Sequence, residues 1–140
     1  MTQESFPSHS EADHPWLRLI PVLLLKHGLI VRSENFETHQ AIGNPMSTVA
    51  RLSDWNVDEL VILDISAHDE HDLRRDDLYQ NYEGSSSLDV LAAIAKHCQM
   101  PLTFGGRIRT LDDIEQRLLL GADKVSINSQ AILDPSFVEA

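Results

Sequence analysis

Residues 101–128 read PLTFGGRIRTLDDIEQRLLLGADKVSIN, and this stretch decides the class of fold. Two short apolar segments, 101–104 and 124–127, lie on either side of a segment with the marks of a helix. Thr110 can cap that helix, acidic residues follow in its first turn, apolar residues recur at helical spacing, and Gly121 can end it. A strand, a helix and a strand in this order predict a parallel sheet.

The same alternation continues toward the start of the chain. Segments 16–25 (WLRLIPVLLL) and 59–65 (ELVILDI) are almost continuously apolar, as expected for strands buried on both faces of a parallel sheet. Helices are predicted over 44–55, where a proline suits the first helical position, and over 88–97, which the serines of 85–87 can cap. The predicted order β-α-β-α-β-α-β indicates an α/β fold, wound as an open sheet or closed into a barrel.

The length of the chain sets the expected domain organisation. With 140 residues it is shorter than an eight-stranded (β/α) barrel, which needs about 250. Residues 1–15 are polar and lack an apolar period, so we expect a flexible acidic tail there and a partial barrel of four βα units over 16–140. Asp134 and Pro135 resemble the cap and first residue of a helix, so we expect the chain to be truncated within its fourth helix.

The composition argues against several classes of function. The formal charge of −11 repels both a nucleic acid backbone and an anionic membrane surface, so neither is an expected partner. No segment reaches the roughly 20 apolar residues of a membrane span, and the N-terminus lacks the basic and apolar regions of a signal peptide. The single cysteine, Cys98, agrees with a reducing compartment. Together these features predict a cytoplasmic protein.

Polar and small residues follow each predicted strand, and the carboxyl ends of parallel strands are where α/β proteins place their sites. These residues are Lys26 and His27, Asp64 and Ser66, Gly105, Gly106 and Arg107, and Asn128 and Ser129. Backbone N–H groups at paired glycines, with an amide and a hydroxyl nearby, can hold a phosphate. The alternative is that the glycines form a tight turn and that Asn128 and Ser129 cap a helix.

Other reactive side chains leave two interpretations open. Asp64 follows four apolar residues and can act as a base or hydrogen-bond acceptor, or only orient its loop. Residues 68–71 (HDEH) are better explained as a solvated loop than as a metal site, because no regular element holds them. Cys98 is better explained as a small apolar residue than as a nucleophile paired with His97, since neighbours on a helix do not face each other. We predict no metal and no cofactor.

Four segments together, RLIPVLLLKHGLIV, DELVILDIS, PLTFGGRIRTLDD and LLLGADKVSINSQAILDPSF, resemble the cyclase subunit family of imidazole glycerol phosphate synthase. The resemblance covers about residues 18–140, and GADKVSIN is its most specific part. It implies the N-terminal half of a (β/α)8 TIM barrel. It also implies a glutaminase partner at the barrel floor, which supplies ammonia, and a phosphorylated small-molecule substrate.

The resemblance also assigns individual positions. Gly106, Asn128 and Ser129, with Gly105 beside them, match a phosphate site, and Arg32 falls where the family has a substrate-binding lysine. Arg107 replaces the last glycine of the family's GGG, so it would crowd a bound phosphate or pair with it. At the opposite end of the strands, the resemblance implies an ammonia gate formed by Arg18, Glu59 and Lys124, and it implies that Asp123 faces the glutaminase. Charges there are equally a solubilising rim on physical grounds alone.

Leu24 is the main departure from the family. It stands where the cyclases carry an aspartate that acts as acid and base, and a leucine cannot transfer a proton. The segment IPVLLLK instead resembles a paralogous branch that works with a glutaminase and a sugar amidotransferase to convert acetamido to acetamidino groups of surface polysaccharides. We expect this branch; the alternatives are a genuine cyclase of histidine biosynthesis and a non-catalytic half-barrel module for binding or assembly.

Overall fold

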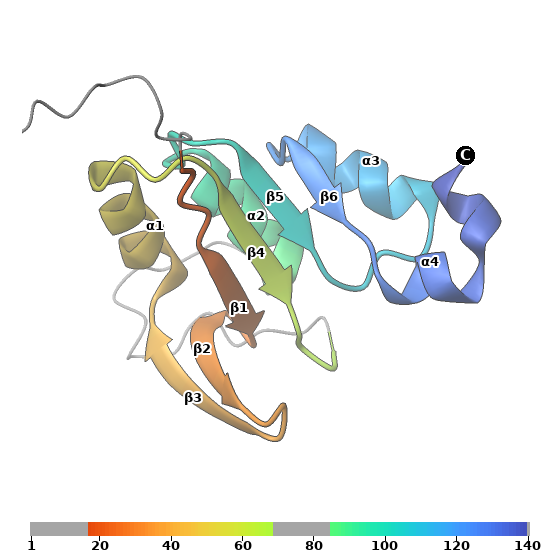
Figure 1. Ribbon diagram of the computed structural model, residues 1–140, viewed down its shortest axis with the longest axis horizontal. Helices are drawn as coiled ribbons and strands as arrows, with labels where there is room; N and C mark the ends of the chain where they lie inside the picture. The colour runs from red at the N-terminus through yellow and green to blue at the C-terminus, as the bar shows by residue number, and fades with distance from the viewer. Residues whose placement is uncertain (1–16, 69–84, 140) are drawn as a thin grey trace, which may run out of the picture.

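The computed structural model describes residues 17–68 and 85–139. Its core is a six-stranded sheet with the order β3-β2-β1-β4-β5-β6 (Figure 1). The strands are β1 (Val22–Lys26), β2 (Leu29–Glu34), β3 (Thr38–Gly43), β4 (Leu60–Asp64), β5 (Leu102–Gly105) and β6 (Lys124–Ser126). Neighbours among β1, β4, β5 and β6 pair in parallel. The α/β class is therefore confirmed, and the architecture is that of a partial (β/α) barrel.

Helices α2 and α3 lie between parallel strands as predicted, α1 follows the hairpin strand β3, and local capping explains where all three begin. Helix α1 (Pro45–Asp54) starts behind Asn44, whose side chain accepts a hydrogen bond from the N–H of Met46. Helices α2 (Ser87–Ala95) and α3 (Leu111–Leu119) each begin with a full capping box, formed by Ser86 with Asp89 and by Thr110 with Asp113. Each box satisfies two N–H groups that would otherwise lack a partner.

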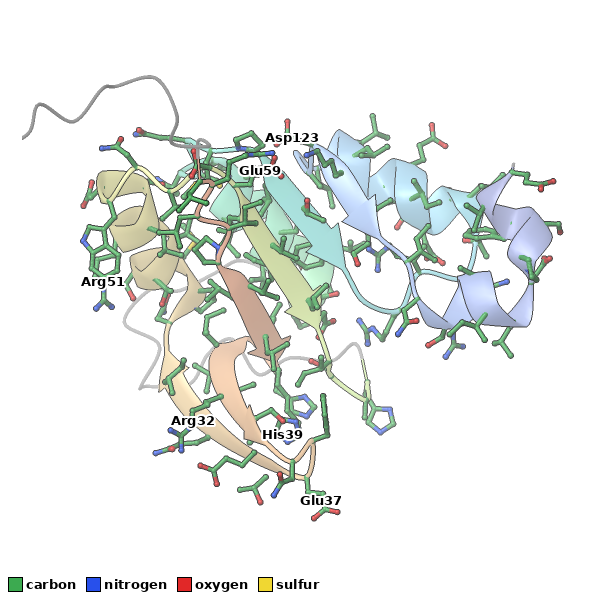
Figure 2. The ribbon with its side chains drawn as sticks, viewed as in Figure 1. Arg32, Glu37, His39, Arg51, Glu59 and Asp123 are labelled. Carbon is green, nitrogen blue, oxygen red and sulfur yellow. The ribbon has the colours of Figure 1, made fainter. Side chains whose placement is uncertain are left out.

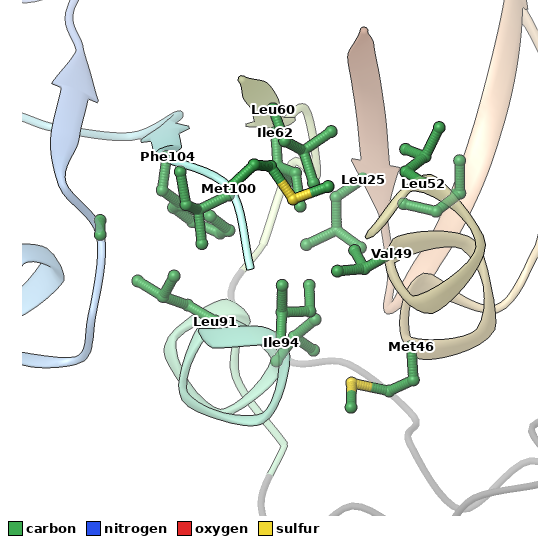
Figure 3. Close-up of a cluster of buried hydrophobic side chains, with 14 of the residues drawn as sticks. Leu25, Met46, Val49, Leu52, Leu60, Ile62, Leu91, Ile94, Met100 and Phe104 are labelled. Atoms are coloured by element: carbon green, nitrogen blue, oxygen red, sulfur yellow. The ribbon is translucent and has the colours of Figure 1, made fainter. Parts of the chain in front are cut away.

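The hydrophobic core lies between the sheet and helices α1 and α2 (Figure 3). Alternate residues of the parallel strands point into it, and Leu25, Leu60, Ile62 and Phe104 are fully buried there. From the helices come, among others, Val49, Leu91 and Ile94. Because β1, β4, β5 and β6 pair in parallel, their carboxyl ends lie at one edge of the sheet and their amino ends at the other.

The antiparallel hairpin β2–β3 was not predicted, so the expected order of elements was wrong between the first strand and the first helix. Strand β2 pairs with β1, and β3 pairs with β2. His27 and Gly28 join β1 to β2, and both have positive φ, as a two-residue turn of type I′ requires. The apolar part of β2 is short and β3 is mostly exposed. The stability of the hairpin therefore depends on the pairing of β2 with β1, which the pattern of apolar residues does not reveal.

The ends of two predicted elements also differ. The first strand begins at Val22 rather than at residue 16, because Pro21 cannot donate a ladder hydrogen bond and Leu17 and Leu19 are exposed. Near the end of the chain, α4 (Ser129–Leu133) precedes the predicted helix start, and Pro135–Val138 form a 3₁₀ helix that Asp134 caps.

Two predictions fall on other parts of the chain: the tail over 1–15 and most of the 68–71 loop lie outside the described residues. Within the ranges that are described, no helix is long and apolar enough to cross a membrane.

Candidate functional site

A cavity of about 810 Å³ opens at the carboxyl ends of β4, β5 and β6. Its lining includes four of the predicted phosphate-binding positions, Gly106, Arg107, Asn128 and Ser129, together with the predicted acid or base Asp64 and with Arg109, Ser126 and Gln130. These residues come from three separate loops. The strand-end rule therefore located this group correctly, and the structure brings its members together.

The turn after β5 depends on Gly106. Its φ is +108°, a backbone conformation that other residues rarely adopt, and a Cβ added there would lie 2.2 Å from the backbone oxygen of Asp64. Gly105 makes a second close approach, since its added Cβ would lie 2.8 Å from the Cβ of Ser126. The paired glycines thus let the β5 loop pass directly against the neighbouring strand ends.

Asp64 and Arg107 form an ion pair at the wall of the cavity. The Arg107 Nη2 atom lies 3.3 Å from Asp64 Oδ2 and also donates to the Ser87 hydroxyl at 3.1 Å. The other Asp64 oxygen accepts from the Ser66 N–H at 2.9 Å, and Asp64 is only 4% exposed. Arg107 has a φ of +54°, so its backbone is held in a region that L-residues visit rarely. The arginine therefore offsets a buried carboxylate beside the cavity.

Arg117 is a site residue that the sequence analysis missed. It is 4% exposed, and its guanidinium donates to the backbone oxygens of Gly106 at 2.9 Å and Asp113 at 2.7 Å. It therefore fastens helix α3 to the glycine turn. The available signal was its spacing, because Arg117 lies four residues after an acid on the predicted helix, where such pairs meet.

The opposite edge of the sheet carries a cluster of opposite charges. Glu59 is 8% exposed; its Oε1 accepts from Arg18, and its Oε2 accepts from the Lys124 ammonium at 2.9 Å. Asp123 accepts from the Leu102 N–H at 2.7 Å and so also orders the start of β5. Figure 2 shows Glu59 and Asp123 at this edge, away from the hairpin that carries Arg32. The three predicted gate residues are thus in contact.

Residues 18–140 match the family described as histidine biosynthesis protein. The chain belongs to this family. "Putative imidazole glycerol phosphate synthase subunit hisF2" of Campylobacter jejuni is 42% identical over 121 residues, which cover 86% of this chain and 44% of the relative. Imidazole glycerol phosphate synthase subunit HisF of Methanosphaerula palustris is 40% identical over 121 residues, which cover 86% of this chain and 41% of the relative.

The Vibrio vulnificus protein that is also named as a hisF2 subunit is 37% identical over 123 residues, which cover 88% of this chain and 41% of that protein. This member of the histidine biosynthesis family therefore spans less than half the length of these relatives. The resemblance read from the four quoted segments is confirmed as membership of the histidine biosynthesis family, with relatives that are named as HisF and hisF2 subunits.

Two positions that the family resemblance singled out lie away from the large cavity. Arg32 is on the hairpin, where it pairs with Glu34, and Leu24 is on β1; both line a separate cavity of about 250 Å³. Lys26 contacts His39 at 3.0 Å, and the His27 N–H donates to Ser66 at 2.9 Å. The end of β1 is therefore tied to the hairpin and to the β4 loop rather than to the cavity.

The remaining reactive groups bear on metal and thiol chemistry. Within residues 17–68 and 85–139, no group of three His, Cys, Asp or Glu side chains is placed to hold a metal ion. Burial raises the pKa of the Cys98 thiol, the hydrogen bond to Met100 opposes this, and the Asp123 carboxylate adds to it. The thiol therefore stays protonated at neutral pH, as its interpretation as a small apolar residue requires.

The Asp113 carboxylate gives the first testable prediction for this histidine biosynthesis protein. Partial burial would raise its pKa, but hydrogen bonds from Arg109 and Thr110, with the charge of Arg117, lower it more, so the net shift is downward. A lowered pKa adds stability above about pH 4 that is lost as the pH falls through the folded-state pKa. We expect Asp113→Ala to lower the free energy of unfolding by about 1 kcal/mol at pH 7.

Urea unfolding between pH 7 and pH 2.5 tests this, with Asp112→Ala as the matched control on the same helical turn. The difference between wild type and Asp113→Ala should shrink steadily below about pH 4. A difference that stays constant down to the lowest pH would contradict the assignment of the lowered pKa to this cap.

Proposed function

We propose that this chain is the substrate-phosphate-binding and ammonia-receiving part of a subunit related to imidazole glycerol phosphate synthase. The observation that carries the proposal is the pairing of two features on the same strands. A cavity lined by Gly106, the Asn128 amide and the Ser129 hydroxyl lies at the carboxyl edge, and a buried glutamate with two cations lies at the amino edge. A phosphate at one edge and ammonia arriving at the other would meet along the strands.

The phosphate side is supported by chemistry that the cavity itself offers. Asn128 precedes α4 without making a side-chain capping hydrogen bond, so a capping role does not account for its amide. Gly106 is part of the cavity wall, where backbone N–H groups can face a ligand, and Arg107 adds a cation that can pair with it. These groups suit a phosphate ester of a small molecule.

The ammonia side rests on the contact of Arg18 and Lys124 with Glu59. Charged residues that only keep a protein in solution are exposed, whereas Glu59 is buried. Burying a charge costs free energy unless it is paired, so solubility alone does not explain this cluster. We propose that this cluster forms the gate for ammonia and that a glutaminase docks beside it, near Asp123. The names of the relatives, which are subunits of a synthase, support an assembly of this kind.

We further propose the sugar-modifying branch, in which ammonia condenses with the carbonyl of an acetamido group to give an acetamidino group, the oxygen leaving as water, with the help of a sugar amidotransferase. Leu24 supports this branch because an apolar side chain cannot serve as the acid and base that cyclisation requires. The second candidate is a cyclase of histidine biosynthesis, which is favoured by the 40% identity to a relative named as a HisF subunit.

Binding to the glutaminase subunit of the same organism tests the partner. We expect a complex by calorimetry and size exclusion, and we expect Lys124→Glu to weaken it by at least about fivefold, because a reversed charge disrupts both the cluster and the docking face. Arg32→Glu, which reverses an exposed charge on the hairpin away from this edge, is the matched control (Figure 2). Equal binding by both variants would rule out docking at this edge.

A second experiment separates the two branches. The gene is expressed in a histidine auxotroph, with Leu24→Asp as the companion variant. The sugar-modifying branch predicts no growth with wild-type protein. Growth restored by the wild type would assign the protein to histidine biosynthesis.

A further inference from the structure

The hairpin β2–β3 is joined to the rest of the sheet along a short stretch. Its ladder with β1 pairs residues 24–26 with residues 29–31, whereas β2 goes on to pair with β3 as far as Glu34 and Thr38. In the sheet that the described residues form, β3 borders no strand other than β2. The outer half of the hairpin therefore depends on side-chain contacts to keep its place against β1.

One such contact joins β1 to β3 across β2. The Lys26 Nζ atom lies 3.0 Å from His39 Nδ1, and both residues are half-buried. Because a lysine side chain carries only N–H donors, His39 Nδ1 must accept, and the imidazole ring must be neutral in this contact. A protonated ring carries hydrogen on both nitrogens, which removes the acceptor and sets two positive charges against each other. The contact therefore depends on the protonation of His39.

Ser33 offers the protonated ring a second partner. It is directly opposite His39 in the register of β2 and β3, so the two side chains share one face of the hairpin and start about 5 Å apart. Among the described residues, the Ser33 Oγ atom is buried without a hydrogen-bond partner. A buried hydroxyl in this state costs free energy, and an imidazolium N–H can donate to it. His39 thus has a donor nearby when it is neutral and an acceptor nearby when it is charged.

The acidic groups of the hairpin do not compensate a charge on His39. Glu34 pairs with Arg32, and the alternation of β2 places both on the face opposite Ser33 and His39. Figure 2 shows Glu37 at the tip of the hairpin, directed away from the sheet. Protonation of His39 is therefore opposed by Lys26 and is not rewarded by an ion pair on the same face.

The neighbouring groups outside the hairpin do not compensate this charge either. At the end of β4, Asp64 pairs with Arg107. The other titratable neighbours are His27, in the turn between β1 and β2, and His68, after β4. Histidines gain positive charge over the same range of pH, so these two add to the repulsion as the pH falls.

We propose that His39 is a pH-sensitive switch that fixes or releases the outer half of the hairpin. With a neutral ring, Lys26 donates to His39 and holds β3 against β1. When the ring gains a proton, it leaves Lys26 and donates to Ser33, and the outer half loosens. This role of His39 is independent of the ligand that the large cavity binds.

Hydrogen–deuterium exchange of the full chain tests the switch at about pH 8 and about pH 5.5, on either side of the usual histidine range. Exchange is corrected for its intrinsic rate and expressed relative to β4 and β5 in the same samples. We expect the protection of residues 29–43 to be about fivefold lower at the lower pH in the wild type. In His39→Gln, whose side chain does not titrate, it should not change with pH.

His97→Gln is the matched control, because it removes an exposed histidine just after α2 and should behave like the wild type. If the protection of the wild-type hairpin does not fall at the lower pH, or falls equally in His39→Gln, the switch is refuted.

Two further variants test the two partners of His39. Lys26→Met keeps an apolar stem without the ammonium, so at about pH 8 its hairpin should be protected only as well as that of the wild type at about pH 5.5. Ser33→Ala should lower protection about threefold further at about pH 5.5 and should not lower it at about pH 8. Wild-type protection in Lys26→Met would refute the first contact, and wild-type protection in Ser33→Ala at the lower pH would refute the second.

Discussion

Gly106→Ala is expected to lower the free energy of unfolding by about 3–5 kcal/mol and to weaken phosphate binding by more than about tenfold. The added Cβ would meet the Asp64 backbone oxygen at 2.2 Å, and the φ of +108° would be strained for alanine. The backbone, unlike a flexible side chain, cannot move aside without shifting β4 or the β5 loop. Because a domain of this size is stable by only about 5–15 kcal/mol, the change removes a large share of the total.

Urea unfolding and phosphate calorimetry measure the two effects. Gly43→Ala is the control, because its Cβ would meet only the Thr48 hydroxyl at 3.1 Å, and its φ is outside the positive range. That variant should lose less than about 1 kcal/mol. If Gly106→Ala were as stable as Gly43→Ala and bound phosphate like wild type, the close approach of the β5 loop to Asp64 would be wrong.

Asp64→Asn is expected to change stability and anion binding in opposite directions. The buried carboxylate accepts from Ser66 and pairs with Arg107, whereas an amide would present N–H groups to the guanidinium. Breaking a buried pair is costly, and because Arg107 is partly exposed we expect a loss of about 2–3 kcal/mol. Removing one negative charge from the wall should at the same time strengthen phosphate binding about fivefold at low salt.

The same two measurements apply, with Asp54→Asn as the control for the loss of one charge. Asp54 is exposed at the end of α1, toward the amino edge of the sheet. Asp54→Asn should change neither the free energy of unfolding nor phosphate binding by much. Weaker phosphate binding by Asp64→Asn would mean that the carboxylate organises the cavity and does not merely oppose the ligand.

The parallel part of the fold could be predicted because its strands form continuous apolar runs and its helices carry capping residues and apolar residues at helical spacing. Segment 59–65 and the helices capped by Ser86 and Thr110 were located in this way. The hairpin could not, because β3 is mostly exposed and its pairing with β2 is a tertiary effect. Two signals were nevertheless present, since His27–Gly28 and Asn35 occupy turns that need positive φ.

The candidate site was predictable where it follows the strand ends and unpredictable where it depends on helix packing. Asp64, Gly106 and Asn128 each come shortly after a strand, so topology alone gathers them. Arg117 reaches the same loop from α3 by donating to the Gly106 backbone oxygen. The spacing of apolar residues predicts that the helix exists, but it does not predict how the helix is rotated about its axis, which is what turns Arg117 inward.

The hairpin β2–β3 also protects the protein against aggregation. Residues 24–26 of β1 (LLK) would otherwise present an unpaired strand edge as a template for other chains. The hairpin covers these backbone groups and puts β3 at the border of the sheet, where Thr38, His39 and Gln40 make the edge polar. An edge of this composition discourages strand addition, so the segment that was hardest to predict shields the apolar part of the sheet.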